Sequence, residues 1–214
     1  MKIKSFEGGF DKNLSYLIWC ESTRLAGIID ASVNITEMVE FIESYSLIID
    51  KIFITHTHHD HIHFLDDILY QFPQIQICVY NNTNFKFKNN YRKLSHHEII
   101  PIGQELITII YTPGHYIDSI CLWNRKAYSL FTGDTMFVGR TGRTVSKSSN
   151  IIDLYESIYD KLLTLPDKTQ IYPGHHYGFK KNVTLKENKV LSPFFQCNSQ
   201  SEFIDVMRNY EANR

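Results

Sequence analysis

The stretch Thr55–His61, which reads THTHHDH, decides the fold of this chain. It directly follows an apolar run whose second half is predicted to be a buried strand. His56 and His58 are two residues apart, so an extended chain points both side chains to the same side. Asp60 and His61 follow where the chain leaves the strand. Imidazole and carboxylate are ligands that suit zinc, iron or manganese, so the stretch predicts a metal site at a strand end.

Three later segments repeat one arrangement, in which a predicted strand is followed by a small or rigid turn and then by one metal-type side chain. Glycine lets the backbone turn sharply and proline restricts it, so the side chain is held in place. These turns therefore predict further ligands for the same site. The segments are Thr112-Pro113-Gly114-His115, Thr132-Gly133-Asp134-Thr135 and Tyr172-Pro173-Gly174-His175.

Apolar patterning along the rest of the chain predicts strands and helices in alternation. Asn34 is expected to cap the first helix, and Pro73 to end the second. The aromatic-rich segment 81–97 is open to two interpretations, a lid over the site or a hairpin packed on the core. Strand-rich halves that each close with helices predict an α/β layered domain. The predicted strands are 14–20, 25–29, the second half of 47–54, 75–80, 106–112, 119–123, 128–132 and 169–172, and the predicted helices are 35–45, 62–72, 151–163 and 203–210.

The composition is that of a globular protein, with 214 residues, 43% hydrophobic and 21% charged side chains and a net charge of −1. The near-zero charge argues against a nucleic-acid binder that works through a basic face. No stretch reaches the roughly 18 apolar residues of a membrane span, and the first residues lack the apolar run of a signal peptide. Four scattered cysteines without a CxxC pair are typical of reduced, packed thiols in a cytoplasmic protein. They are Cys20, Cys78, Cys121 and Cys197.

Taken together, the four motifs resemble those of metallo-β-lactamase-fold hydrolases, whose pattern is HxHxDH followed by Gly-His, Gly-Asp and Gly-His turns. The resemblance implies a four-layer αβ/βα sandwich with the metal site at the open edge between two sheets. It covers nearly the whole chain, which is expected to form a single domain over residues 1–214 with a short C-terminal helical tail at about 183–214. The matching positions are His56, His58, Asp60, His61, His115, Asp134 and His175.

The resemblance also assigns these positions to two divalent metal ions. Zn²⁺ is expected, with iron or manganese as alternatives. The implied ligands are His56, His58 and His115 on the first metal, Asp60, His61 and His175 on the second, and Asp134 bridging both.

The chemistry implied by the resemblance is attack on a carbonyl carbon by a hydroxide that the two cations share. Asp60 and Asp134 would position this nucleophile and are the expected catalytic residues. Asp30, Thr55 and Thr112 are candidates for orienting the ligands from outside.

The run 133–144, GDTMFVGRTGRT, is similar to the corresponding segment of glyoxalase II thioesterases and persulfide dioxygenases. Both act on glutathione-linked sulfur compounds, so a small glutathione- or other thiol-linked substrate is implied. Arg140 and Arg143 are candidates for binding a substrate carboxylate, and Tyr177 for lining the pocket rim.

Three functions are compatible with these motifs. Hydrolysis of a thioester or related ester is favoured, because all seven binuclear positions are filled. A persulfide dioxygenase with a single iron is the alternative. A non-catalytic metal-binding regulatory protein of the same fold comes third. Such a protein is expected to lack a ligand, and none is missing here.

Overall fold

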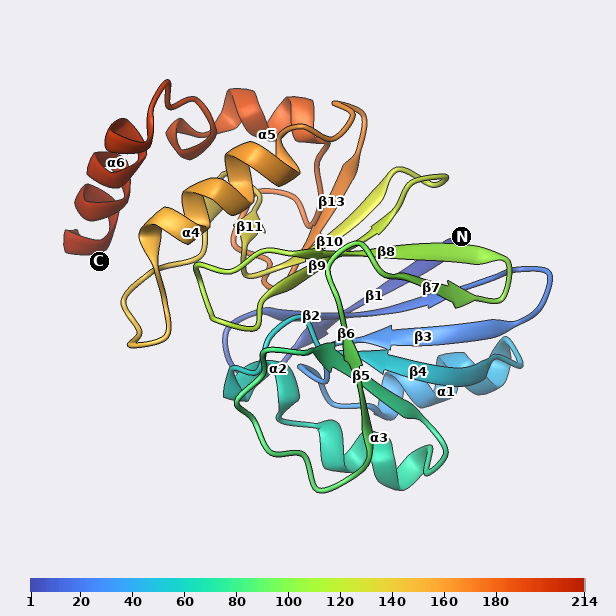
Figure 1. Ribbon diagram of the computed structural model, residues 1–214. Coiled ribbons are helices and arrows are strands. Elements are labelled where there is room, and N and C mark those ends of the chain that lie inside the picture. The colour runs from blue at the N-terminus through green and yellow to red at the C-terminus, as the bar shows by residue number, and fades with distance from the viewer. Residues whose placement is uncertain (214) are drawn as a thin grey trace.

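The computed structural model describes residues 1–213, in which two large β-sheets pack face to face with helices on both outer faces, and a separate small sheet has two strands (Figure 1). The first sheet has the strand order β1-β2-β3-β4-β5-β6, and the second has the order β13-β10-β9-β8-β7. The elements of the first half are β1 (Lys2–Gly8), β2 (Asn13–Trp19), β3 (Leu25–Ile29), α1 (Thr36–Ser44), β4 (Ile48–Phe53), α2 (His59–Ile62), α3 (Leu65–Gln71), β5 (Gln76–Tyr80), β6 (Tyr91–Leu94) and β7 (Ile99–Ile102). Those of the second half are β8 (Glu105–Tyr111), β9 (Ile120–Asn124), β10 (Ser129–Gly133), β11 (Met136–Phe137), β12 (Arg140–Thr141), α4 (Ile151–Glu156), the π-helix η1 (Ser157–Leu162), β13 (Gln170–Pro173), α5 (Leu185–Leu191), the 3-10 helix η2 (Pro193–Phe195) and α6 (Gln200–Ala212).

Three apolar clusters separate four layers. Successive residues of a strand face opposite sides, so in β4 Ile52 packs with the helices α1 and α3 while Phe53 packs between the sheets. Phe131 of β10 joins Phe53 in the central cluster. The third cluster joins the second sheet to α4 and α6, through side chains such as Leu154 and Phe203. The predicted four-layer αβ/βα sandwich is confirmed.

The sheet topology brings several strand ends to one edge. In the first sheet β3 and β4 are parallel. In the second sheet β10 runs parallel to β13, and both β8 and β10 run antiparallel to β9 between them. The carboxyl ends of β8, β10 and β13 therefore lie together. The backbone N–H of Ile120 donates to the carbonyl of Thr55 at 2.8 Å and joins the two sheets at this edge. The predicted ligands all follow strands that end here.

Most predicted strands match observed strands to within one or two residues, but β1, β6, β7, β11 and β12 were not predicted. The strand expected in the second half of 47–54 covers Ile48–Phe53. The prediction of one helix over 62–72 is wrong, because the N–H of Phe64 donates to the carbonyl of Ala31 at 2.9 Å and separates α2 from α3. The second of these helices ends at Gln71, before Pro73.

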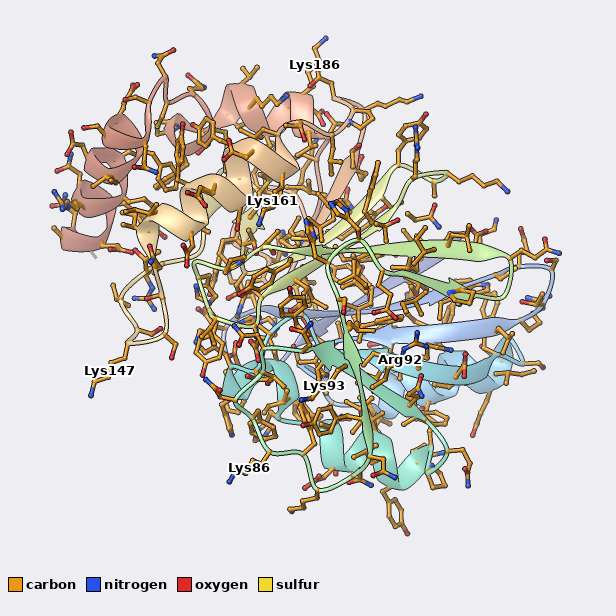
Figure 2. All side chains as sticks on the ribbon, viewed as in Figure 1. Lys86, Arg92, Lys93, Lys147, Lys161 and Lys186 are labelled. Atoms are coloured by element: carbon orange, nitrogen blue, oxygen red, sulfur yellow. The ribbon has the colours of Figure 1, made fainter. Side chains whose placement is uncertain are left out.

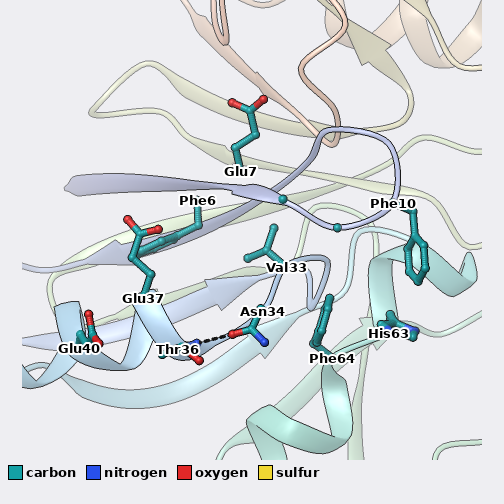
Figure 3. A pocket seen from close by; sticks show the side chains of 12 residues that line it. Phe6, Glu7, Phe10, Val33, Asn34, Thr36, Glu37, Glu40, His63 and Phe64 are labelled. Carbon is teal, nitrogen blue, oxygen red and sulfur yellow. Dashed lines mark hydrogen bonds between the residues drawn. The ribbon is translucent and has the colours of Figure 1, made fainter.

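Asn34 is not the cap of α1, whose N-cap is Ile35. Its side-chain oxygen nevertheless accepts a hydrogen bond from the N–H of Thr36 at 2.9 Å (Figure 3). Asn34 therefore still satisfies one of the N–H groups at the start of the helix.

Two further segments differ from expectation. The predicted helix 151–163 changes from α to π geometry at Ser157. The segment 81–97 is not a hairpin, because its strand β6 pairs in parallel with β5. It also lines none of the cavity over the predicted ligands, as a lid would. Phe87 and Tyr91 of this segment pack against the cluster beneath α1 and α3. These two aromatic side chains thus serve the core, as the hairpin interpretation expected, whereas Phe85 is exposed.

The predicted helical tail contains α5 and α6, whose side chains Leu185, Phe203 and Met207 pack in the same cluster as α4. Organisation as a single domain stays a prediction. Within residues 1–213, no helix is long and apolar enough to cross a bilayer. Basic side chains are dispersed, since Lys86, Lys147 and Lys186 extend from separate parts of the molecule (Figure 2).

Candidate metal centre

Three of the predicted ligands form a compact nitrogen cluster. Nδ1 of His58 lies 3.0 Å from Nε2 of His56 and 3.0 Å from Nε2 of His115. The three donor atoms lie within 4.8 Å of one another, at a spacing suited to one shared cation.

A second cluster lies beside the first and contains a carboxylate. Oδ2 of Asp60 is 3.2 Å from Nε2 of His175 and 3.6 Å from Nε2 of His61. His61 and His175 are buried, whereas Asp60 is partly open to solvent. These donors also lie within 4.8 Å of one another.

Asp134 lies between the two clusters. Its Oδ1 is 3.3 Å from Nε2 of His61, and its Oδ2 is 3.4 Å from Nε2 of His175. The same Oδ2 is 3.6 Å from Nε2 of His115 in the first cluster. One carboxylate therefore faces donors of both clusters. The structure thus brings together all seven residues, and their assignment to two metals stays a proposal.

Four of the histidines are oriented by hydrogen bonds through the ring nitrogen that faces away from the centre. A histidine that donates through Nδ1 presents an unprotonated Nε2, which is the form that binds a metal. The hydrogen bonds run from His56 to Oγ1 of Thr55 (3.2 Å), from His61 to Oδ2 of Asp30 (2.9 Å), from His115 to the carbonyl of Arg143 (2.8 Å) and from His175 to the carbonyl of Asp11 (2.8 Å).

Two of the three residues expected to orient the ligands contact them. Asp30 is 2% exposed and accepts hydrogen bonds from the N–H and the hydroxyl of Thr55, each at 2.7 Å, besides the one from His61. Thr112 instead lies 3.0 Å from the hydroxyl of Thr135. This contact joins the turn that carries His115 to the turn that carries Asp134.

Three polar residues that support the site were not predicted from the sequence. The amide of Asn13 donates to Oδ2 of Asp60 at 2.8 Å. Asp118 accepts from the N–H and the hydroxyl of Thr57, at 3.1 and 2.6 Å, and so holds the strand end that carries the first histidines. The third is Asp11, whose carbonyl accepts from a ligand histidine. Their contacts span at least 47 residues of sequence, so no local pattern marks them.

The two clusters differ in electrostatics. Burial lowers the pKa of His58 to about 4 and holds that of His56 well below its usual value, so both are neutral near pH 7. Burial opposes the protonation of His175 too, but the carboxylate of Asp134 outweighs it and raises the pKa to about 10. The carboxylates of the second cluster therefore stabilise a positive charge beside them. Either a proton or a bound cation supplies that charge.

The donors fit a metal ion. Nε2 of His61 and Oδ1 of Asp134 are buried and find no hydrogen-bond partner within residues 1–213. A buried polar atom without a partner costs about 1–3 kcal/mol, so the pair calls for a further group between them. A divalent cation satisfies both atoms, and the set of imidazoles and carboxylates suits zinc or iron.

Gly174 allows the second cluster to close. A Cβ atom at this position would lie 2.3 Å from Oδ1 of Asp134 and 2.7 Å from Cε1 of His61. We expect Gly174→Ala to displace Asp134 and to lower the metal content by about one ion per chain, as measured by elemental mass spectrometry. Gly8→Ala is the control, because a Cβ there meets only Val33, at an ordinary 3.7 Å. Equal metal content in the two variants would show that the close approach is unimportant.

A cavity of about 330 Å³ opens over the ligands. Arg143 and Tyr177, two of the predicted substrate-binding residues, line it together with Phe10, Val145 and Ser146. The third, Arg140, lies behind Tyr177, where its guanidinium is 5.1 Å from the ring centroid and donates to the Tyr177 carbonyl at 3.2 Å.

A second cavity of about 500 Å³ is also lined by Phe10 (Figure 3). Its walls carry Glu7, Glu37 and Glu40 and none of the seven predicted ligands. The ring of Phe10 meets that of His63 edge-on at 4.7 Å and forms part of both cavities. The cavity over the metal-type donors is therefore the one suited to chemistry.

Fold and site together define a class of protein, a two-sheet αβ/βα sandwich with a His/Asp metal centre where strands of both sheets end. The family model described as the metallo-beta-lactamase superfamily matches residues 8–175. The chain belongs to this superfamily.

Curated relatives and a solved structure agree with this membership. The chain is 29% identical over 209 residues to the probable hydroxyacylglutathione hydrolase glo2 of Schizosaccharomyces pombe, with 95% of this chain and 77% of the relative covered. A second probable hydroxyacylglutathione hydrolase of that yeast is 32% identical over 189 residues, with coverages of 86% and 71%. The crystal structure of ETHE1 from Myxococcus xanthus superposes with a TM-score of 0.87 at 30% identity, covering 98% of this chain and 91% of that one.

Proposed function

We propose that this protein is a binuclear metal-dependent hydrolase of a thioester or a related ester. The observation that carries the proposal is the position of Asp134, whose two oxygens face the donors of both clusters. Two divalent metals bound there, for which we propose Zn²⁺, supply a water of lowered pKa and polarise a carbonyl oxygen. The names of the two yeast relatives support a hydrolase that acts on a thiol-linked acyl group.

Asp60 and Asp134 are the proposed catalytic residues. Each is ionised, because the neighbouring His175 and His61 outweigh burial and hold both carboxyl pKa values well below their usual range. An ionised carboxylate accepts a hydrogen bond from the attacking water and directs its lone pair towards the carbonyl carbon. The hydrogen bond from the side-chain amide of Asn13 fixes the orientation of Asp60.

Arg143 and Tyr177 are proposed to bind the substrate. The guanidinium of Arg143 is exposed at the wall of the cavity and suits a carboxylate, such as those of glutathione. The ring of Tyr177 stacks on His175, with centroids 4.8 Å apart, and its hydroxyl donates to Oδ2 of Asp11 at 2.7 Å. This arrangement makes Tyr177 a fixed wall beside the second cluster, with Arg140 supporting it.

One observation favours the alternative, a persulfide dioxygenase with a single iron. Donor atoms of His56, His61 and Asp134 also lie within 4.8 Å of one another. Two histidines and one carboxylate are the ligand set of many non-haem iron oxygenases. This subset leaves the other four donors without a metal, so it explains less of the site than the binuclear assignment.

Metal analysis and two activity assays separate these functions. We expect close to two metals per chain in protein purified without chelators or added metals, and hydrolysis of S-lactoylglutathione followed by loss of thioester absorbance. One iron per chain, with oxygen uptake on glutathione persulfide and no thioester cleavage, would replace the hydrolase with the dioxygenase. Two tightly bound metals without either activity on a wider thioester and ester panel would favour the regulatory protein.

The proposed location is the cytoplasm. Cys20, Cys78, Cys121 and Cys197 are all buried free thiols, as expected where thiols stay reduced. Cell fractionation tests this proposal, and recovery in an oxidising compartment would contradict it.

A further inference from the structure

The carboxyl end of α6 contacts a segment beside the metal centre. Oε1 of Glu211 accepts hydrogen bonds from the N–H of Thr144 at 2.5 Å and from its hydroxyl at 3.0 Å. These residues are 67 positions apart in the sequence, and Figure 1 shows the end of α6 next to the loop that leads into α4. Buried side chains of α6, Phe203 and Met207, fix the helix in the outer apolar cluster.

The N–H that Glu211 holds belongs to the same peptide group as a carbonyl at the metal centre. The carbonyl of Arg143 accepts the hydrogen bond from Nδ1 of His115 at 2.8 Å. A peptide group is planar, so fixing the direction of its N–H also fixes the direction of its C=O. A carboxylate on the N–H further polarises the peptide and makes its oxygen a better acceptor.

The residue before this peptide group offers little conformational restriction of its own. Residue 142 is a glycine, whose dihedral angles are the least restricted of any residue. It is also in tight contact with the centre, since a Cβ there would lie 2.8 Å from Nδ1 of His115. Besides the hydrogen bond from His115, Thr144 and the peptide before it receive two contacts from outside the segment, and Glu211 provides both.

We propose that Glu211 is a positioning residue for the metal centre. It orients the peptide between Arg143 and Thr144, which orients His115 and keeps the proton on Nδ1, so that Nε2 faces the first cluster. The same contact sets the wall of the cavity formed by Arg143, Val145 and Ser146. This inference rests on the proposed metal centre, and it links the C-terminal helix to metal affinity.

The test compares Glu211→Ala with Glu211→Gln and with the control Asp205→Ala, which removes an exposed carboxylate from the same helix. Zn²⁺ affinities of the two sites are measured by competition with a chelator, and the Nδ1 proton of His115 is followed by NMR in the zinc-loaded proteins. We expect Glu211→Ala to weaken one of the two sites about 10-fold or more and to speed exchange of the His115 proton. Glu211→Gln keeps an acceptor and recovers most of the affinity, and Asp205→Ala behaves as the parent protein.

Zinc affinity and proton exchange in Glu211→Ala that match those of Asp205→Ala would overturn the inference. Equal weakening of both sites in Glu211→Ala, without recovery in Glu211→Gln, would also overturn it, because that is the result of a general loss of structure. Circular dichroism of the metal-free proteins checks that every variant folds. These readouts do not depend on thioester cleavage, so a failure of the proposed hydrolysis is recognised separately, in the parent protein.

Discussion

Replacing Asp134 by Asn is expected to lower kcat/KM for thioester hydrolysis by about 10³-fold or more, which corresponds to about 4 kcal/mol of transition-state stabilisation. Asn has the shape of Asp without its charge, and its NH₂ group has no lone pair to offer a bound cation. Both Oδ atoms of Asp134 lie within 3.6 Å of ligand nitrogens, so either orientation of the amide places the NH₂ group among ligands where an oxygen is needed. Steady-state kinetics and metal content per chain measure the effect.

Asp67→Asn is the matched control, because it removes one exposed carboxylate on α3, away from the centre. We expect Asp134→Asn to keep its circular dichroism spectrum while binding less metal than this control. Full hydrolytic activity in Asp134→Asn, with metal content unchanged, would exclude a role for Asp134 between the two clusters.

The parts of this site that were predictable from sequence share one property, which is that they are encoded locally. A strand end, a glycine turn and a histidine or aspartate lie within four residues, as in Tyr172-Pro173-Gly174-His175. Parallel strands then bring separate local signals to one edge, and so the seven predicted ligands meet there. The alternation of strands and helices predicted an α/β layered domain, and the four-layer sandwich was implied by the resemblance that these motifs carry.

The supporting contacts were less predictable, because each depends on residues that are far apart in sequence. Asn13 reaches Asp60, and Glu211 reaches Thr144, only once the whole fold has formed. Short elements were also missed, because the paired strands β11 and β12 have two residues each and carry no measurable period. The change to π geometry at Ser157 leaves the apolar stripe of the helix in place, so periodicity does not reveal it.

Replacing Asp30 by Asn is expected to reduce both stability and metal binding. Asp30 has a φ of +59°, a conformation that Asn tolerates, so the backbone is not strained by the change. Its two oxygens accept from the N–H and hydroxyl of Thr55 and from Nδ1 of His61, and in either orientation the new NH₂ group would face one of these donors. We expect a loss of about 3 kcal/mol in the free energy of unfolding, measured by denaturant on metal-free protein.

The second effect of Asp30→Asn separates a ligand-orienting role from a structural one. Without the carboxylate, His61 is free to carry its proton on Nε2, and in that form it cannot bind a metal. The control is Glu105→Gln, which replaces a buried carboxylate at the start of β8 that accepts from Asn124 at 3.1 Å and from the N-terminal amine at 2.6 Å. Both variants should unfold more easily, but only Asp30→Asn should lose about one metal per chain by elemental mass spectrometry. If the two variants retained the same metal, the contact of Asp30 with His61 would serve the fold alone.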